Sequence, residues 1–317
     1  MEACSSPQRK AHRLMEAAVL LNQIHPSPPK RAREEETGLE QLGHPFLQGF
    51  DDAALLRFME DRAICKLFHD RAAPHAFFGV FDGHGGAEAS EFCAEHLHDN
   101  IINSQHFPDI IPALKDGFLR TDADFLTLAE TATCKKVTES GSAAVTLLVT
   151  LEQLSVACAG DCRALLIKRD GTHVDLSTDH TAELHENSCV PLRPDEAERV
   201  SSTGGVMDHG VVWVGDNSLP MTRAVGDMHL KVAEGRNWHS SPADHQVVTA
   251  LPEVQTCDRS ANDLCVVLAS DGVFGSVMSS AQVASLTMHE LQQHRGLQDA
   301  EKRAAMALAD SAYGQHH

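Results

Sequence analysis

The segment of this chain most able to do chemistry joins an apolar run to an acid and a histidine. Residues 77–86 read Phe-Phe-Gly-Val-Phe-Asp-Gly-His-Gly-Gly. The apolar run is typical of a buried strand, and the glycines allow the backbone to come close to whatever the acid binds. Asp82 can bind a hard divalent cation, and His84 can transfer a proton. A Gly-rich turn with a polar corner is the plainer alternative, because such turns are common.

Other carboxylates stand in similar places, directly after apolar runs. They are Glu60 and Asp61 after residues 55–59, Asp161 after 153–159, Asp227 after 223–226, and Asp271 after 264–269. If the strands lie in facing sheets, their ends can meet in one cleft. Clustered carboxylates repel one another, so the cluster needs cations or it takes up protons. Oxygen ligands indicate Mg²⁺ or Mn²⁺ rather than zinc, and two such ions can activate water for attack on phosphorus.

The elements that must position these acids follow from the apolar periodicity. Helices are expected at residues 87–103, 109–131, 194–203, 280–294 and 299–313. Strands are expected as a pair at 142–151 and 153–159, as a hairpin at 163–168 and 173–177, and as buried runs at 211–214 and 264–269. Since the strands cluster as hairpins and the helices lie outside them, the pattern predicts an α+β fold. Its antiparallel sheets should be covered by helices in a layered sandwich.

The composition narrows the classes of partner. The chain has 317 residues, 42% of them hydrophobic, which suffices for one large domain or two small ones. Its 45 acidic residues outnumber the 26 Lys and Arg, for a formal charge of −19. Such a surface disfavours nucleic acid and anionic lipid and suits metal cations or basic segments, although solubility explains the acidity equally well. Nine cysteines without a Cys-x-x-Cys pair favour reduced thiols in an intracellular protein.

The N-terminal part differs from the rest of the chain. Residues 1–45 are expected to be a flexible segment, with a short helix at 12–24, because prolines and a charge run follow. Residues 30–33 (Lys-Arg-Ala-Arg) suit a nuclear import signal, and a solvated linker is an equal alternative. There is no apolar signal core and no run of about 18 apolar residues. A cytoplasmic or nuclear protein without membrane contact is therefore expected.

Seven short segments together resemble the PP2C-type metal-dependent serine/threonine protein phosphatases. In the family's order they are residues 59–61, 80–86, 140–145, 159–164, 176–180, 222–227 and 269–274. The resemblance extends from about residue 49 to 313, and seven segments in order are far more specific than one. It implies a four-layer α/β/β/α sandwich with a metal site at one edge. It also implies hydrolysis of phosphoserine and phosphothreonine in phosphorylated protein substrates by a monomer.

The same resemblance implies the metal ligands. Asp82 would bridge two Mg²⁺ or Mn²⁺ ions, and Glu60 with the Gly83 carbonyl would serve one of them. Asp271 would serve the second ion, and Asp161 would bind a weaker third ion. In this family a metal-bound water is the nucleophile, so no phosphoenzyme is expected.

The remaining roles are also implied by the resemblance. His84 would be the general acid that protonates the leaving serine or threonine oxygen, and Asp61 would support the metal ligands. Arg223 and Asp227 match a motif whose role is read as mainly structural.

Some positions depart from the family pattern. The family's phosphate-binding Arg precedes the Glu by four residues, whereas Arg57 precedes Glu60 by three. In a strand this shift turns a side chain to the opposite face unless a bulge corrects it, so both outcomes remain open for Arg57 as a catalytic residue. Phe274 stands for a Trp and should keep its packing role. Gly275 stands for an Asp and should weaken the third metal site.

The last departure concerns the C-terminal end. The family closes with an Asp-Asn segment and a final strand, so residues 46–317 are expected to form a phosphatase domain lacking that strand. The chain is then either a fragment of an active enzyme or a natural short form with impaired activity. The alternative function is a catalytically impaired module that binds phosphoproteins as a scaffold.

Overall fold

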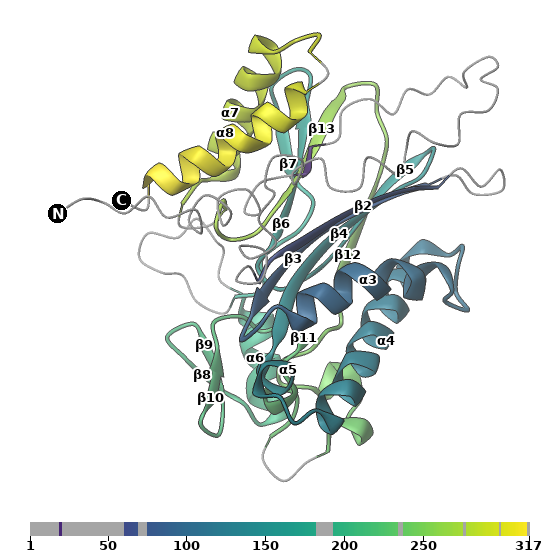
Figure 1. The fold of residues 1–317 in the computed structure, drawn as a ribbon, viewed down its shortest axis with the longest axis vertical. Helices are drawn as coiled ribbons and strands as arrows, with labels where there is room; N and C mark the ends of the chain where they lie inside the picture. Colours follow the sequence, from purple (N-terminus) through teal and green to yellow (C-terminus); the bar gives the residue numbers. More distant parts are fainter. Residues whose placement is uncertain are drawn as a thin grey trace.

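Two antiparallel sheets stack face to face, and each carries a pair of helices on its outer side (Figure 1). The computed structural model describes residues 19–20, 60–68, 75–181, 193–233, 237–274, 277–297 and 299–315. The expected α+β sandwich of antiparallel sheets and covering helices is confirmed.

The larger sheet has six strands and positions most of the acids. Its order is β12-β5-β4-β3-β2, with β11 paired to β4. The strands are β2 (Arg62–Phe68), β3 (His75–His84), β4 (Gly141–Val149), β5 (Gln153–Ala159), β11 (Val225–Gly226) and β12 (Glu253–Asp258). Every residue of β4 is buried, because both faces of this central strand are covered. Its apolar sequence therefore shows no alternation.

The second sheet has the order β1-β13-β6-β7. Its strands are β1 (Val19–Leu20), β13 (Asp263–Ala269), β6 (Arg163–Lys168) and β7 (His173–Asp175). A separate three-stranded sheet consists of β8 (Val206–Asp208), β9 (Val211–Val214) and β10 (Asn217–Leu219).

The helices form the two outer layers. They are α3 (Glu88–Ile102), α4 (Ile110–Thr131), the short α5 (Lys135–Glu139) and α6 (Pro194–Thr203), then α7 (Ser280–Gln293) and α8 (Ala300–Gln315). Three 3₁₀ turns, η2 (Met228–Leu230), η3 (Trp238–Ser240) and η4 (Ala243–His245), lie in the segment after β11. Ser279 and Gln282 form a capping box that starts α7. None of the described helices combines the length and apolarity needed to cross a bilayer.

Three apolar clusters hold the four layers together. Within β3, Phe77 and Phe81 pack beneath α3 and α4, whereas Phe78 and Val80 face the second sheet. This alternation follows from the two-residue period of a strand. The third cluster fills the space beneath α7 and α8 and includes Phe274. The strand ends that carry acids are therefore fixed from both sides.

Several predicted elements agree closely with the structure, and others differ. The helix at 194–203 and the strand at 211–214 have the predicted bounds. The expected helix over 12–24 is wrong at Val19–Leu20, which pair with β13 as a strand. Glu60 and Asp61 lie just before β2, and the apolar run 55–59 in front of them lies outside the described residues. The rest of the expected flexible segment, including residues 30–33, lies outside the described residues.

Candidate active site

Acids from three distant parts of the chain meet at one edge of the stacked sheets. Asp82 lies near the end of β3, Asp161 in the turn between β5 and β6, and Asp271 just after β13. Burial raises the pKa of Asp82, and repulsion from Asp61, Asp271 and Asp161 raises it further. Burial followed by repulsion from Asp271 also raises the pKa of Asp161. Asp82, Asp161 and Asp271, with Asp61 beside them, are called the acidic cluster below.

The acidic cluster has the properties of a site for a divalent cation. A carboxylate oxygen of Asp82, one of Asp161 and the thiol of Cys162 all lie within 4.8 Å of one another. Oδ1 of Asp161 is buried and has no hydrogen-bond partner among the described residues. A buried carboxylate oxygen without a partner is costly, and carboxylates are the ligands that Mg²⁺ and Mn²⁺ prefer. The predicted metal chemistry therefore fits the residues present.

The other predicted ligands lie around Asp82. The Glu60 side chain is exposed, and its main-chain carbonyl accepts a hydrogen bond from the Ser90 hydroxyl. Gly83 lies so close to that carbonyl that a side chain at this position would collide with it. Arg57 and Gly275 lie outside the described residues, so the questions about the phosphate-binding Arg and the third ion stay predictions.

His84 is held by Asp227, a contact that the sequence did not predict. Nε2 of His84 lies 2.8 Å and 2.9 Å from the two carboxylate oxygens of Asp227. Burial by itself lowers the pKa of His84, but the charge and hydrogen bond of Asp227 outweigh it and raise the pKa. Gly141 is required beside this pair, because a Cβ there would collide with both side chains. Asp227 therefore fixes and charges the ring of the predicted general acid, in addition to any role in the fold.

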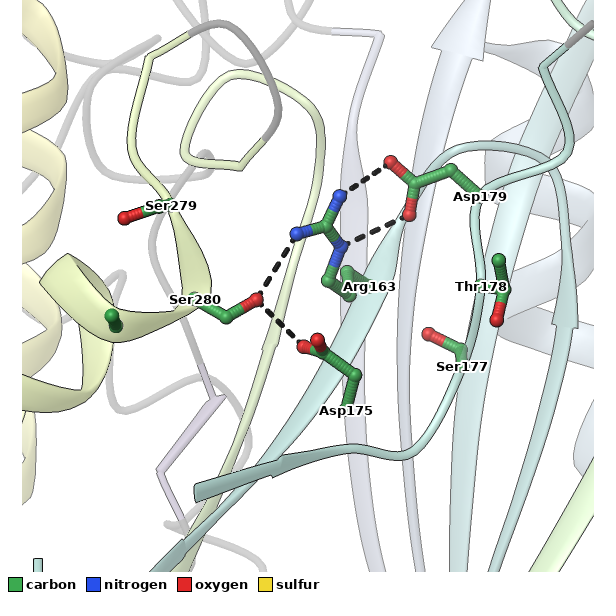
Figure 2. A pocket seen from close by; sticks show the side chains of 8 residues that line it. Arg163, Asp175, Ser177, Thr178, Asp179, Ser279 and Ser280 are labelled. Atoms are coloured by element: carbon green, nitrogen blue, oxygen red, sulfur yellow. Dashed lines mark hydrogen bonds and ion pairs between the residues drawn. The ribbon is translucent and has the colours of Figure 1, made fainter. Parts of the chain in front are cut away.

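A pocket of about 280 Å³ lies between β6 and the start of α7 (Figure 2). Arg163 donates to both oxygens of Asp179, at 3.0 Å and 2.8 Å, and to the Ser280 hydroxyl at 3.1 Å. The guanidinium also lies 5.0 Å from the ring centroid of Phe274, which is fully buried. These contacts tie α7 to the turn that carries Asp161, and they agree with the packing role predicted for Phe274.

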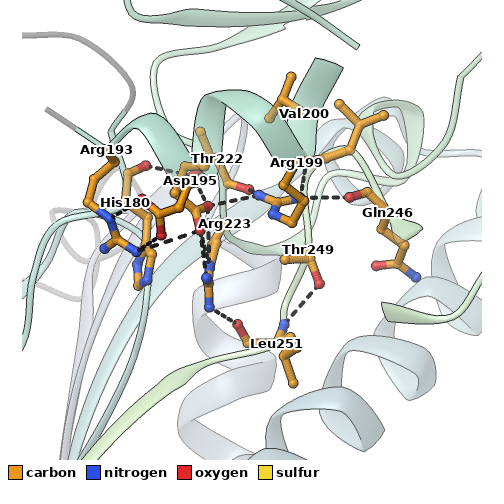
Figure 3. A network of polar contacts seen from close by, with 12 residues as sticks. His180, Arg193, Asp195, Arg199, Val200, Thr222, Arg223, Gln246, Thr249 and Leu251 are labelled. Atoms are coloured by element: carbon orange, nitrogen blue, oxygen red, sulfur yellow. Dashed lines mark hydrogen bonds and ion pairs between the residues drawn. The ribbon is translucent and has the colours of Figure 1, made fainter. Parts of the chain in front are cut away.

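Arg223 belongs to a second polar group, which we call the arginine network (Figure 3). It consists of Arg193, Arg199 and Arg223 around Glu196 and Glu253. Arg223 donates to Glu196 at 2.6 Å and to the Leu251 carbonyl at 2.8 Å. Burial opposes ionisation of Glu196, yet the bonds and charges of Arg223 and Arg199 lower its pKa. The structural role expected of Arg223 agrees with these contacts.

Two features of the segment around Asp227 could not be predicted from the sequence. The contact between His84 and Asp227 spans 143 positions, which no local pattern reports. Asp227 was noted as an acid after residues 223–226, but its side-chain partner could not be predicted. Lys231 is buried within the same segment and carried no sequence signal beyond its charge.

Comparisons with known proteins agree with this geometry. The sequence profile of the family described as protein phosphatase 2C matches residues 47–316. The probable protein phosphatase 2C 14 of Arabidopsis thaliana is 35% identical over 253 residues, which are 78% of this chain and 49% of that protein. The probable protein phosphatase 2C 25 of the same plant is 37% identical over 71% of this chain and 50% of its own length.

The chain spans about half to two thirds of the length of the curated relatives it matches. Among solved structures, a serine-threonine phosphatase 2C from Toxoplasma gondii has a TM-score of 0.64 at 22% identity. The match covers 82% of this chain and 86% of that one. A Caenorhabditis elegans sex determining protein has a TM-score of 0.60 over 80% of this chain and 58% of its own, at 21% identity. These two structures share the fold.

Proposed function

Because the chain belongs to the protein phosphatase 2C family, we propose that it hydrolyses phosphoserine and phosphothreonine in proteins with Mg²⁺ or Mn²⁺ as cofactor. The activity is assigned to the folded unit from about residue 46 onward, acting as a monomer in the cytoplasm or nucleus. Phosphorylated proteins are its substrates.

The observation that carries the proposal is the convergence of Asp82, Asp161 and Asp271 around an unpartnered buried oxygen. Asp82, Glu60, the Gly83 carbonyl and Asp271 would hold two ions, and Asp161 would hold a weaker third ion. When bound, the cations neutralise the phosphate and activate water for in-line attack.

The residues of the chain then supply the proton for the leaving group. His84 directs Nε2 at Asp227, so Nδ1 is the ring nitrogen that can donate to the departing serine or threonine oxygen. Asp227 fixes the ring and stabilises its charged form, which is the form that can act as an acid. The chemistry therefore needs both the acidic cluster and the histidine pair.

The test is manganese-dependent release of phosphate from a phosphothreonine peptide by the full chain. The double variant Asp82→Ala with Asp271→Ala should abolish turnover, because it removes two of the three converging acids. The matched control is Asp208→Ala with Asp216→Ala, which removes two exposed carboxylates of the small sheet and should leave turnover unchanged. Turnover that survives the first pair, or that needs no divalent cation, would contradict the mechanism.

A further inference from the structure

Lys231 follows η2, and its side chain is completely buried. Its ammonium lies 3.0 Å from Oδ1 of Asp122 in α4 and donates to the Ala224 carbonyl at 2.9 Å. Asp122 is only 3% exposed. A buried ion pair of this kind rarely adds to stability beyond what apolar packing would provide. A contribution to stability therefore does not account for the presence of this ion pair.

The Asp122–Lys231 pair contacts the short segment around Asp227 on two sides. Oδ1 of Asp122 accepts a hydrogen bond from the Gly226 amide at 2.8 Å, while Lys231 reaches back to Ala224. Ala224 and Gly226 precede Asp227, and Lys231 follows it. The segment from Ala224 to Lys231, called the Asp227 turn below, is thus fixed against α4 on both sides of Asp227.

Asp227 requires such support, because its backbone is in the left-handed region with φ of 53°. This region is unfavourable for residues other than glycine, although Asp tolerates it better than most. Two backbone hydrogen bonds support this conformation. The Asp227 amide donates to the Ser140 carbonyl at 3.1 Å, and the Leu230 amide donates to the Asp227 carbonyl at 2.8 Å. In this conformation the carboxylate meets Nε2 of His84.

We propose that the buried Asp122–Lys231 pair is a positioning device for catalysis, which fixes the Asp227 turn so that Asp227 holds His84 in its proton-donating orientation. The proposal rests on the proposed function, since it assigns His84 the role of general acid. Neither Asp122 nor Lys231 touches the reacting atoms, and both act through Asp227. A pair that served only to stabilise the core would have no effect on which leaving groups the enzyme accepts.

The leaving group supplies the first test. A serine or threonine alkoxide must be protonated as it departs, whereas p-nitrophenolate can leave without a proton. In Lys231→Met, kcat for a phosphothreonine peptide should fall about 10- to 100-fold, a part of the ~10²–10⁴ that general acids contribute. For p-nitrophenyl phosphate it should fall less than about threefold, and KM should stay the same for both substrates.

Two further variants separate an effect on catalysis from a loss of folding or stability. Asp122→Asn with Lys231→Met leaves no unpaired buried charge and retains an acceptor for the Gly226 amide, so it serves if the single variant does not fold. Leu114→Ala is the matched control, because this fully buried side chain lies about two turns from Asp122 in the same helix. The control should lose stability and yet keep the wild-type ratio of activities on the two substrates.

A double-mutant cycle supplies the second test. If Lys231 acts through His84, then Lys231→Met should have almost no further effect in a His84→Gln background. Equal losses on both substrates, or losses that add in the cycle, would overturn the proposal and leave the pair a structural one.

A third readout does not depend on turnover. The His84 ring resonances, assigned by comparison with His84→Gln, should shift at fixed pH in Lys231→Met and remain in place in Leu114→Ala. Unchanged resonances in Lys231→Met would overturn the inference. If the unmodified chain hydrolyses neither substrate with Mn²⁺, the proposed function fails instead, and the resonances still report whether the pair positions His84.

Discussion

Two groups of carboxylates in this molecule have pKa values shifted in opposite directions. In the arginine network, Glu196 is surrounded by guanidinium groups, and its pKa is lowered despite burial. In the acidic cluster, Asp82 and Asp161 face mainly other acids, and their pKa values are raised. The network is complete within the protein, whereas the cluster needs cations from solution. The direction of the pKa shift therefore distinguishes a structural group of charges from a candidate metal site better than burial alone does.

The largest effect is expected from Asp82→Asn, which removes the acid closest to the centre of the cluster. Turnover with Mn²⁺ should fall by at least about 10³-fold, because metal sites supply several kcal/mol of transition-state stabilisation. Saturating Mn²⁺ adds about 2.7 kcal/mol to the stability of a protein at 100 times the Kd, and this increment should shrink.

Phosphate release from a phosphothreonine peptide measures the loss of turnover, and chemical unfolding with and without Mn²⁺ measures the stability increment. Without metal, the variant should be no less stable than the wild type, because one source of repulsion is gone. A metal-free variant that is clearly less stable would mean that the cluster is structural after all, and the comparison with the network would break down.

The next effect is expected from Glu196→Gln in the arginine network. This change leaves Arg199 without its carboxylate partner and Arg223 with only Glu253 at 3.6 Å, and removing one partner of a buried ion pair typically costs about 3–5 kcal/mol. Urea unfolding measures the loss. The increment of stability that Mn²⁺ adds should stay as in the wild type. A loss of that increment would show that the two groups are coupled.

Acid should weaken the network in a defined range of pH. The His180 ring, whose Nε2 lies 3.4 Å from the Glu253 carboxylate, and then Arg193 lower the pKa of Glu253 to about 2, against about 4.3 for an ordinary Glu. The stability contributed by Glu253 is therefore fully present above about pH 4.3 and is lost as the pH falls toward 2. The difference in stability between wild type and Glu253→Gln, followed by unfolding from pH 7 downward, should vanish in this range. A difference that stays constant would mean that Glu253 keeps an ordinary pKa.

The smallest effect is expected from Asp195→Asn at the rim of the network. Asp195 accepts two bonds from Arg193, but its side chain is 62% exposed. Exposed ion pairs contribute about 1 kcal/mol or less. A loss in urea unfolding as large as that of Glu196→Gln would show that exposure does not rank the members of the network.

Elements with strong local signals could be predicted from the sequence. The helix α6 has Pro194 in its first turn and the left-handed Gly204 at its C-cap, so its bounds were predictable. The small sheet around β9 was not, because β8 and β10 have three residues each and largely exposed side chains. Such short strands carry too few residues for a periodic pattern. Their pairing depends on contacts with the rest of the chain.

Asp82, Asp161 and Asp271 were singled out from the sequence and lie together in the structure, and their role as metal ligands stays a prediction. Asp82, Asp161 and Asp271 stood out because each follows an apolar strand or lies near its end. Glu60 lies just before β2, and the apolar run in front of it, predicted as a strand, lies outside the described residues. The unpartnered Oδ1 of Asp161 could not be foreseen, because a missing partner is a property of three-dimensional packing.

The sequence by itself determined which side chains this protein has for chemistry: carboxylates at strand ends, a histidine two residues after one of them, and glycines where the backbone must come close. Only the tertiary structure decided which charges face one another, since Asp122 and Lys231 or His84 and Asp227 are separated by a hundred residues or more. The physical reason is that electrostatic energy depends on distance and burial, and both are properties of the folded chain.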